Sequence, residues 1–266
     1  MTEQRMVVVT GASSGIGRAI ALACGRQGWR VAIGARRVER LEDTAAEARA
    51  VGGEVFAHHL DVTDPASVAG FIAAAEAALG PVDVLVNNAG VASPGWLDQT
   101  PVEALQRDVA TNLLGPLLTS RLVVASLKSR RASGDLVFVT SDATRHPRPR
   151  MAAYTATKAG VEAFAHALAM ELEGTGIRAT TVRVGPTLSE FGFGWPPNEI
   201  EDLMGYWPRF GLQRHAGVLD ASAVADAVLT AVSAPRGVHL DTIEVQPEAP
   251  VGATGPAEAF ERPGGG

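Results

Sequence analysis

The sequence predicts an α/β domain, a doubly wound parallel sheet of about seven strands with helices on both faces. Short β-branched runs alternate with helical stretches from residue 6 to residue 245. These runs are apolar throughout, as strands covered on both faces are, instead of alternating between apolar and polar residues. The 266 residues also suit one large domain of this kind.

The expected elements follow one another in chain order. Each strand is a short apolar run, and the expected strands are residues 6–9, 31–33, 55–57, 82–86, 135–140, 177–184 and 238–245. Each helix is a longer stretch between strands, and the expected helices are residues 15–27, 38–50, one that begins at 64, 101–131, 152–173 and 221–233. Asp64 suits an N-cap and Pro65 a first helical turn. Because strand–helix–strand connections are right-handed, this order indicates a Rossmann-like sheet.

A single domain is expected over residues 1–246, since no repeat or linker divides them. Two segments interrupt the alternation of strands and helices. Between residues 188 and 217 a loop and a short helix replace a direct connection, and we expect this segment to form a lid. The tail at 247–266 is rich in Pro, Gly, Ala and Glu, so it is expected to be flexible.

Composition narrows the function. The formal net charge is -6, so the broad basic surface that nucleic-acid binding needs is not expected. Cys24 is the single cysteine, which excludes an intramolecular disulfide, and no cluster of Cys or His predicts a metal site. The start of the chain shows no apolar signal segment, and the apolar runs are too short or too interrupted to span a bilayer. We therefore expect a cytoplasmic protein with neither membrane nor nucleic-acid partners.

A glycine-rich loop follows the first strand and reads Thr10-Gly11-Ala12-Ser13-Ser14-Gly15-Ile16-Gly17. Its three glycines leave the backbone bare where the chain turns into a helix. The N–H groups at the start of a helix, together with its dipole, favour a pyrophosphate at this place. The spacing Gly-x-x-x-Gly-x-Gly differs from the general dinucleotide fingerprint. The position between strand and helix nonetheless favours a dinucleotide-binding loop over an ordinary glycine-rich turn.

The second strand ends in Ile33-Gly34-Ala35-Arg36-Arg37. An acidic residue near this point would bind the free ribose 2′-hydroxyl of NAD, and none is present. Arg36 and Arg37 instead supply planar cations that suit a 2′-phosphate. We therefore expect NADP(H) to be preferred and NAD(H) to be possible. The simpler alternative is that both arginines are solvated at the start of a helix.

Further motifs stand in register along the chain. They are Asp61-Val62 after the third strand, Asn87-Asn88-Ala89-Gly90 after the fourth, Asn112 in the long helix, Ser141 after the fifth strand, and Tyr154-x-x-x-Lys158 thirteen residues later. With the glycine loop, these motifs resemble those of the short-chain dehydrogenase/reductase family, over about residues 5 to 246. Each motif alone is weak, and their common register makes the resemblance specific.

The resemblance implies a set of site residues. Its catalytic residues are Asn112, Ser141, Tyr154 and Lys158. The residues assigned to the cofactor, by the resemblance and by the patterns above, are Gly11, Ser13, Ser14, Gly15, Ile16, Gly17, Arg36, Arg37, Asp61, Val62, Asn88, Ala89, Gly90, Tyr154, Lys158, Gly185, Thr187 and Ser189. One segment departs from the family pattern Pro-Gly-x-x-x-Thr, because residues 184–189 read Val-Gly-Pro-Thr-Leu-Ser. Ser189 keeps a hydroxyl, so its contact with the nicotinamide carboxamide is expected to persist.

The chemistry centres on Tyr154 and Lys158, which stand four residues apart on an expected helix and so share a face. A nearby ammonium stabilises a phenolate, so Lys158 is expected to lower the pKa of Tyr154 from its ordinary value of about 10. Ser141 can hydrogen-bond the substrate oxygen as charge develops on it. The resemblance adds that Lys158 holds the nicotinamide ribose and that Asn112 holds a water. Tyr154 then serves as general acid or base while a hydride moves between nicotinamide and a carbonyl or alcohol carbon.

Two segments bear on the substrate. Six aromatic residues gather in the expected lid, and they are Phe191, Phe193, Trp195, Tyr206, Trp207 and Phe210. They predict an apolar substrate, although the rings could equally pack on the lid's own helix or on another subunit. The basic run from Arg145 to Arg150 could attract an anionic substrate, while a solvated loop or a subunit contact is the commoner outcome.

Three functions remain open at this point. The first is an NADP(H)-dependent oxidoreductase that acts on a small carbonyl or alcohol substrate. The second is an NAD-dependent dehydrogenase of the same fold, and the third is a dinucleotide-binding regulator without turnover. A complete Asn112, Ser141, Tyr154 and Lys158 set argues against the regulator. The family usually forms dimers or tetramers through its two long helices, here about 101–131 and 152–173, so a homo-oligomer is expected.

Overall fold

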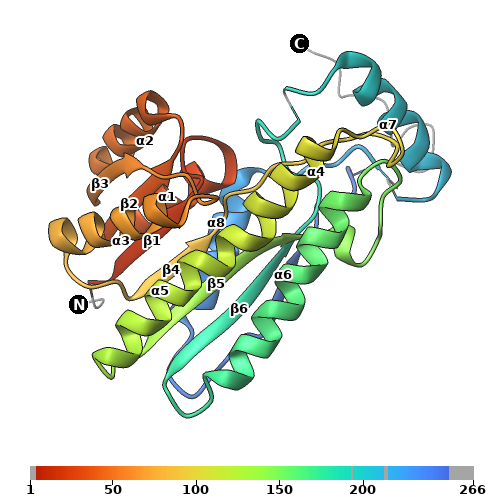
Figure 1. Cartoon of the computed structure of the whole chain (residues 1–266). Helices are drawn as coiled ribbons and strands as arrows, with labels where there is room; N and C mark the ends of the chain where they lie inside the picture. Colours follow the sequence, from red (N-terminus) through yellow and green to blue (C-terminus); the bar gives the residue numbers. More distant parts are fainter. Residues whose placement is uncertain (1–3, 193, 213–214, 252–266) are drawn as a thin grey trace.

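The computed structural model of the chain describes residues 4–192, 194–212 and 215–251 (Figure 1). These residues form a seven-stranded sheet in the order β3-β2-β1-β4-β5-β6-β7, and every neighbouring pair is parallel. The strands are β1 Met6–Thr10, β2 Arg30–Ala35, β3 Glu54–His59, β4 Val84–Asn87, β5 Gly134–Ser141, β6 Ile177–Val184 and β7 Thr242–Val245. The predicted doubly wound α/β fold is confirmed.

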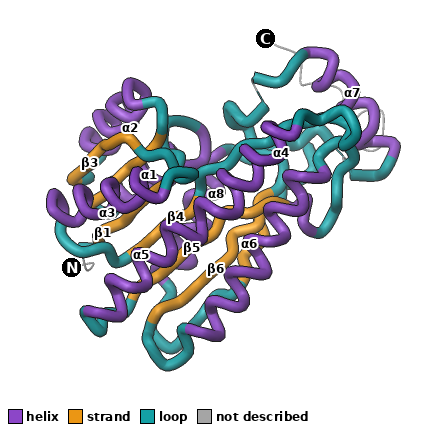
Figure 2. Tube along the Cα trace, in the orientation of Figure 1, coloured by secondary structure: helices purple, strands orange, loops and turns teal. Residues whose placement is uncertain are grey.

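Helices cover both faces of this sheet (Figure 2). The described helices are α1 Gly15–Arg26, α2 Val38–Ala50, α3 Pro65–Leu79, α4 Val102–Val109, α5 Gly115–Ser129, α6 Ala152–Glu171, α7 Pro197–Arg209 and α8 Ala221–Ser233. Helices α1, α2 and α8 contribute to the core on one face, and α3, α5 and α6 to the core on the other. Helix α7 belongs to the segment that was expected to form a lid, and Figure 1 shows it beyond the end of the sheet.

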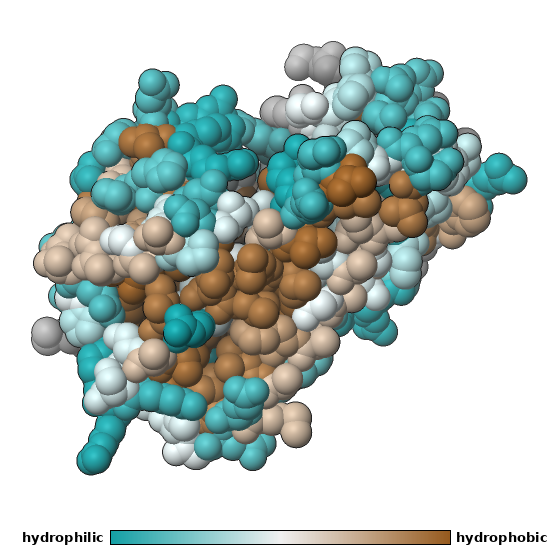
Figure 3. All heavy atoms as spheres, viewed as in Figure 1, coloured by the Kyte–Doolittle hydropathy of each residue, from teal (hydrophilic) through white to brown (hydrophobic). Residues whose placement is uncertain are grey.

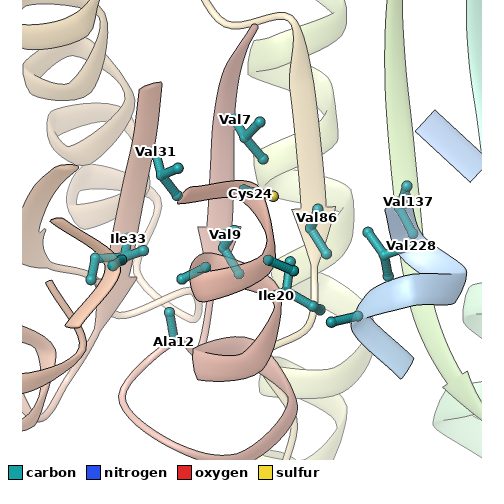
Figure 4. Close-up of a cluster of buried hydrophobic side chains, with 14 of the residues drawn as sticks. Val7, Val9, Ala12, Ile20, Cys24, Val31, Ile33, Val86, Val137 and Val228 are labelled. Carbon is teal, nitrogen blue, oxygen red and sulfur yellow. The ribbon is translucent and has the colours of Figure 1, made fainter. Parts of the chain in front are cut away.

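The strand side chains explain why the two cores form. Successive residues of a strand point to opposite faces. Val7 and Val9 of β1 therefore belong to the core formed with α1 and α8, and Figure 4 shows Val9 beside Ile20 of α1. Met6 and Val8 of β1 belong to the opposite core. Because both faces of β1 are buried, it is apolar from Met6 to Val9, whereas the edge strands β3 and β7 are partly exposed and carry polar residues.

The strand order places the functional site. Counting along the sheet, the chain winds outward from β1 to β3 on one side and from β4 to β7 on the other. The loops after β1 and β4 therefore diverge at the carboxyl edge, where open α/β sheets bind ligands. The glycine loop follows β1, and Asn88-Ala89-Gly90 follows β4. The two motifs meet at this switch point.

The long helix predicted at 101–131 is broken, and this expectation was wrong in one respect. A π-helical turn, Ala110–Leu114, separates α4 from α5, and the N–H of Gly115 donates to the carbonyl of Ala110 five residues back. Pro116 lacks a backbone N–H, so the regular α-helical bond to the Asn112 carbonyl cannot form. The proline explains the break and places Asn112 on the irregular turn. The last strand is also shorter than predicted, since it begins at Thr242.

The same helical stretch bears on the membrane. Among the described residues, Val102–Ser129 is long and apolar enough to cross a bilayer by length and composition, so the expectation that every apolar run is too short needs this exception. Part of the stretch packs in the core, because α5 contacts α3 and β4, and its Val123 and Leu127 are fully buried. A core helix of a soluble protein meets the same criterion.

Candidate active site

The glycine loop after β1 is shaped by a backbone conformation that favours glycine. Gly11 and Gly15 have φ angles of +69° and +52°, in the left-handed region. A Cβ on Gly11 would also lie 2.7 Å from the Cα of Ala89, so the loops after β1 and β4 are in direct contact. A Cβ on Gly17 would lie 2.6 Å from Nδ2 of Asn88. Gly17 therefore serves the packing of the loop, and it does not line the cavity beside it.

Hydrogen bonds hold the two loops together. Asn88 Nδ2 donates to the carbonyls of Thr10 and Gly11 at 3.0 and 3.2 Å. The Thr10 hydroxyl oxygen accepts from the backbone N–H groups of Asn88 and Ala89, each at 3.0 Å. The Asn88 amide is thus used within the protein. Asn88 was predicted to bind the cofactor, and its side chain shapes the loop that would do so. Asn88 also lines the cavity.

A cavity of about 560 Å³ runs along the carboxyl edge of the sheet. That volume lies in the range of small-molecule sites. Almost every predicted site residue lines it, and those that do are Gly11, Ser13, Ser14, Gly15, Ile16, Arg36, Arg37, Asp61, Val62, Asn88, Ala89, Gly90, Ser141, Tyr154, Lys158, Gly185, Thr187 and Ser189. Of the predicted residues, Gly17 and Asn112 stand behind the wall. The positions were scattered over the chain, and the topology brings them to one cleft.

The cleft has the features that a dinucleotide needs. The first turn of α1 begins at Gly15, and Gly15 and Ile16 line the cavity, so backbone N–H groups at a positive helix end face it. No acidic residue stands in that first turn to compete with a pyrophosphate. Ser14, the N-cap residue, makes no capping bond with its side chain, and its hydroxyl instead accepts a hydrogen bond from Arg37 Nη2 at 2.8 Å. The residues present therefore fit a bound dinucleotide.

Asp61 borders the same end of the cavity, after β3. Its Oδ1 accepts from the N–H and the hydroxyl of Thr63, at 2.9 and 2.7 Å. Burial works to raise the pKa of Asp61, but these bonds and the charge of Arg36 outweigh burial and hold the pKa below its usual range. The carboxylate is therefore charged at neutral pH and can accept a hydrogen bond from a base amine.

The four predicted catalytic residues come from three elements. Tyr154 and Lys158 lie on α6, Ser141 ends β5, and Asn112 lies on the π-helical turn. All four side chains are buried. Lys158 Nζ lies 5.9 Å from the centre of the Tyr154 ring and donates to the Val139 carbonyl at 2.9 Å. The i, i+4 spacing thus places the ammonium beside the phenol, as predicted.

Asn112 is fixed by a neighbouring loop. Its Oδ1 accepts from the N–H of Val91 at 2.8 Å, while Nδ2 donates to the Val91 carbonyl at 2.8 Å and to Thr157 Oγ1 at 3.1 Å. The position that a Cβ on Gly90 would occupy lies 3.5 Å from this Oδ1 and 3.4 Å from Lys158 Nζ. Asn112 and Lys158 therefore approach the same glycine, and Asn112 supports the site from behind.

Electrostatics at the centre differ from the expectation. Burial raises the pKa of Tyr154 to about 12, although the hydrogen bond with Ser141 and the charge of Arg148 act in the opposite direction. Burial also lowers the pKa of Lys158 to about 8. The expected fall in the pKa of Tyr154 is therefore absent in the protein alone, because burial outweighs the groups that favour the phenolate. The ammonium lies over the ring and donates to a backbone carbonyl, so loss of solvent decides both groups.

One residue that the sequence patterns missed lines the cavity beside the catalytic residues. Asp142 follows Ser141 directly, is buried, and pairs with Arg148 at 2.6 Å. The Arg148 guanidinium lies 5.0 Å from the ring centre of Trp207. Asp142 also borders Ser141, whose hydroxyl donates to its Oδ1 at 3.3 Å. The adjacency of Asp142 to Ser141 was the available signal.

The three arginines of the basic run 145–150 pair with acidic residues of the same chain. Arg150 is buried, has a φ of +64°, and pairs with Glu199 and Asp202 of α7. Its guanidinium also lies 5.5 Å from the ring centre of Trp96. Arg145 pairs with Glu244 at the surface. Of the residues in this run, Arg148 alone lines the cavity. Only Arg148 is therefore placed to attract an anionic substrate.

The lid places some of its aromatic rings on the cavity. The Phe191 ring centre lies 5.4 Å from that of Tyr154 and 5.5 Å from that of Trp195. Trp195 Nε1 donates to the Ala92 carbonyl at 3.0 Å. Tyr206 instead packs edge-on against Trp96, and Phe210 is 58% exposed. Phe191, Trp195 and Trp207 line the cavity, while Tyr206 and Phe210 do not, and an apolar substrate stays a prediction. Phe193, and tail residues 252–266, lie outside the described residues.

The departure from the family pattern at 184–189 has a visible consequence. Thr187 Oγ1 donates to the Gly185 carbonyl at 2.9 Å, and Ser189 Oγ accepts from the N–H of Phe191 at 3.2 Å. Ser189 Cβ lies 3.1 Å from the position that a Cβ on Gly15 would occupy. The described structure therefore places Ser189 against the glycine loop. The expected contact of this hydroxyl with a carboxamide stays a prediction.

Known proteins share this sequence and fold. A family model described as short chain dehydrogenase matches residues 5–197. The glycine betaine reductase ATRR of Emericella nidulans is 36% identical over 244 residues, and the match covers 91% of this chain but only 19% of the relative. An NADPH-dependent aldehyde reductase-like chloroplastic protein of Arabidopsis thaliana is 34% identical, and the match covers 75% of this chain and 78% of that protein.

Solved structures agree with the sequence relatives. An alcohol dehydrogenase from the archaeon Thermococcus sibiricus, complexed with 5-hydroxy-NADP, superposes with a TM-score of 0.78 at 32% identity, covering 91% of this chain and 96% of that one. Other similar structures carry NADP+, NADPH or NAD. A nicotinamide dinucleotide is thus the common cofactor among these neighbours. This chain, with its parallel sheet, glycine loop and Tyr154–Lys158 pair, belongs to the short-chain dehydrogenase family of oxidoreductases.

Proposed function

We propose that the chain is an NADP(H)-dependent oxidoreductase that acts on a carbonyl or secondary alcohol group of a small, largely apolar substrate. One observation carries the proposal: Ser141, Tyr154 and Lys158 line the same cavity as the glycine loop and Arg37. The cavity thus joins a proton-transfer centre to a place for a phosphorylated ribose. Phe191 and Trp195 add apolar surface beside Tyr154, which favours an apolar substrate.

Each residue has a role that its surroundings support. When bound, the nicotinamide supplies or accepts a hydride at the carbonyl carbon. Ser141 donates a hydrogen bond to the substrate oxygen and places it near the Tyr154 hydroxyl. With a pKa of about 12, Tyr154 is protonated at neutral pH and can donate its proton to that oxygen in reduction. The Lys158 ammonium then stabilises the phenolate, and Asn112 holds Val91 and the loop in place.

The pKa of Lys158 predicts a pH dependence. Burial lowers the pKa of Lys158 to about 8. The side chain is therefore mostly charged below that pH and loses its charge as the pH rises through it. The charge stabilises the phenolate that forms as Tyr154 gives up its proton. The kcat/KM for carbonyl reduction should therefore be constant below about pH 8 and fall above it. A profile that stays flat to about pH 10 would contradict this role of the lysine charge.

The proposal is tested by titrating the protein with NADPH and with NADH, using tryptophan fluorescence, and by screening ketones and aldehydes for NADPH oxidation. Tighter binding of NADPH, with turnover of apolar carbonyls, is the expected result. Tighter binding of NADH would give the NAD-dependent enzyme instead. Binding without turnover of any carbonyl or alcohol would favour a dinucleotide-binding regulator.

We also propose a homo-oligomer in the cytoplasm. The supporting feature is the face that carries α5 and α6 (Figure 1), over which apolar side chains gather (Figure 3). Val109 and Leu114, next to this face, are 47% and 43% exposed. Apolar surface of this kind marks interaction sites in soluble proteins. Light scattering coupled to gel filtration should give a dimer or tetramer mass, and a monomer mass at micromolar concentration would refute the assembly.

A further inference from the structure

Glu190 of the lid is held by two arginines of the α2 region. Arg37 Nη1 donates to its Oε2 at 3.0 Å, and Arg40 pairs with its Oε1. The two guanidinium groups hold the pKa of Glu190 below its usual range, so the side chain is an anion at neutral pH. Glu190 comes from the loop after β6, about 150 residues beyond Arg40 in the chain. The lid thus supplies a carboxylate to a basic pair that belongs to the first half of the fold.

The groups around this carboxylate also suit a phosphate monoester. Arg37 Nη2 donates to the hydroxyl oxygens of Ser13 and Ser14, at 3.1 and 2.8 Å. Two guanidinium groups and two hydroxyls are therefore gathered at one place, next to the glycine loop. Planar guanidinium groups bind carboxylates and phosphates in the same geometry, so one anion can substitute for the other. The cavity that holds the dinucleotide site is lined by Ser13, Arg37 and Glu190 together.

We propose that Glu190 occupies the place of the cofactor's 2′-phosphate, that NADP(H) must displace it from Arg37 and Arg40, and that it thereby sets how strongly the protein prefers NADP(H) over NAD(H). This inference rests on the proposed assignment of Arg37 to a 2′-phosphate. It makes a lid residue, remote in sequence from the glycine loop, a determinant of cofactor choice. Its neighbour Ser189 rests on Gly15, so displacement of Glu190 also loosens the lid from the glycine loop.

The size of the effect follows from exposure. The side chains of Arg37, Arg40 and Glu190 are 51%, 50% and 33% exposed, so each ion pair is partly screened by solvent. Exposed pairs of this kind are weak, and a phosphate can displace the carboxylate. Removal of the charge should therefore strengthen binding of a 2′-phosphate by about fivefold, a change that corresponds to one exposed ion pair. A ligand without that phosphate gains nothing.

The experiment compares adenosine 2′,5′-bisphosphate with adenosine 5′-monophosphate by calorimetric titration of Glu190→Gln and the unaltered protein. Neither probe contains nicotinamide, so the result does not depend on turnover. Glu47→Gln is the matched control, because Glu47 and Glu190 both line a second, smaller hollow beside Arg40, and Glu47 pairs with Arg18 instead of Arg37. Both variants lose one negative charge from the neighbourhood. A third variant combines Glu190→Gln with Arg37→Ala.

The expected result is about fivefold tighter binding of the bisphosphate by Glu190→Gln, with the monophosphate and the Glu47→Gln control changed by less than about twofold. The gain should disappear when Arg37 is also replaced. An unchanged affinity of Glu190→Gln, an equal gain in Glu47→Gln, or a gain that survives without Arg37 would overturn the inference. If the unaltered protein binds both probes equally while Glu190→Gln gains for the bisphosphate alone, the competition stands and the NADP preference fails.

Discussion

Replacement of Tyr154 by phenylalanine should reduce kcat for carbonyl reduction by about a thousandfold, which equals about 4 kcal/mol of transition-state stabilisation. The substitution removes one hydroxyl and keeps the ring that packs beside Phe191. The substrate oxygen then lacks its proton donor, while Ser141 and Lys158 remain. NADPH binding should change by less than about threefold, because the glycine loop and Arg37 are untouched. Single-turnover kinetics and a fluorescence titration measure the two quantities.

The chain offers one matched control, since Tyr206 is its only other tyrosine. Tyr206 lies on α7 and packs against Trp96, away from the catalytic residues. Tyr206→Phe should keep kcat within about twofold of the unaltered enzyme. Thermal unfolding of both variants shows whether either loss comes from instability. If Tyr154→Phe stays folded and keeps a tenth or more of the activity, the acid/base role belongs to another group.

The fold was predictable because its signal is repeated. The central strands carry apolar runs because both of their faces are buried, and the helices between the strands set the winding. The π-helical turn at Asn112 was not predicted. Pro116 was the available signal, because without an N–H it cannot donate the regular helical hydrogen bond to the Asn112 carbonyl. Periodicity is judged over windows of about 11 to 18 residues, so the five-residue turn is averaged with the helix on either side of it.

The sequence predicted which residues form the site better than it predicted the interactions among them. The motifs around Tyr154 and the glycine loop name groups that act on a ligand, and the topology places them in one cavity. Asp142–Arg148 and Arg37–Glu190 are ion pairs that no sequence motif marks, and the second joins residues 153 positions apart in the chain. The pKa values depend on burial as well as on spacing, which is why proximity of Lys158 to Tyr154 alone gave the wrong direction.

Replacement of both Arg36 and Arg37 by alanine should weaken NADPH by about a hundredfold and NADH by less than about threefold. The structure divides this loss unequally. Arg37 donates hydrogen bonds to Ser13 and Ser14 of the glycine loop. Arg36 instead lowers the pKa of Asp61 through its charge. Arg37→Ala alone should therefore weaken NADPH by about thirtyfold, since hydrogen bonds to charged groups each contribute about 1.5 to 3 kcal/mol. Arg36→Ala should cost about threefold.

The comparison must separate a specific contact from a loss of positive charge. Arg26 is exposed at the end of α1, far along that helix from the glycine loop, so Arg26→Ala removes the same charge without the contact. Its NADPH affinity should stay within about twofold of the unaltered protein. Equal weakening of NADPH and NADH by Arg37→Ala would mean that the arginine shapes the loop and reads no 2′-phosphate. Selective weakening of NADPH, seen with Arg37→Ala and absent with Arg26→Ala, would identify Arg37 as the residue that distinguishes the two cofactors.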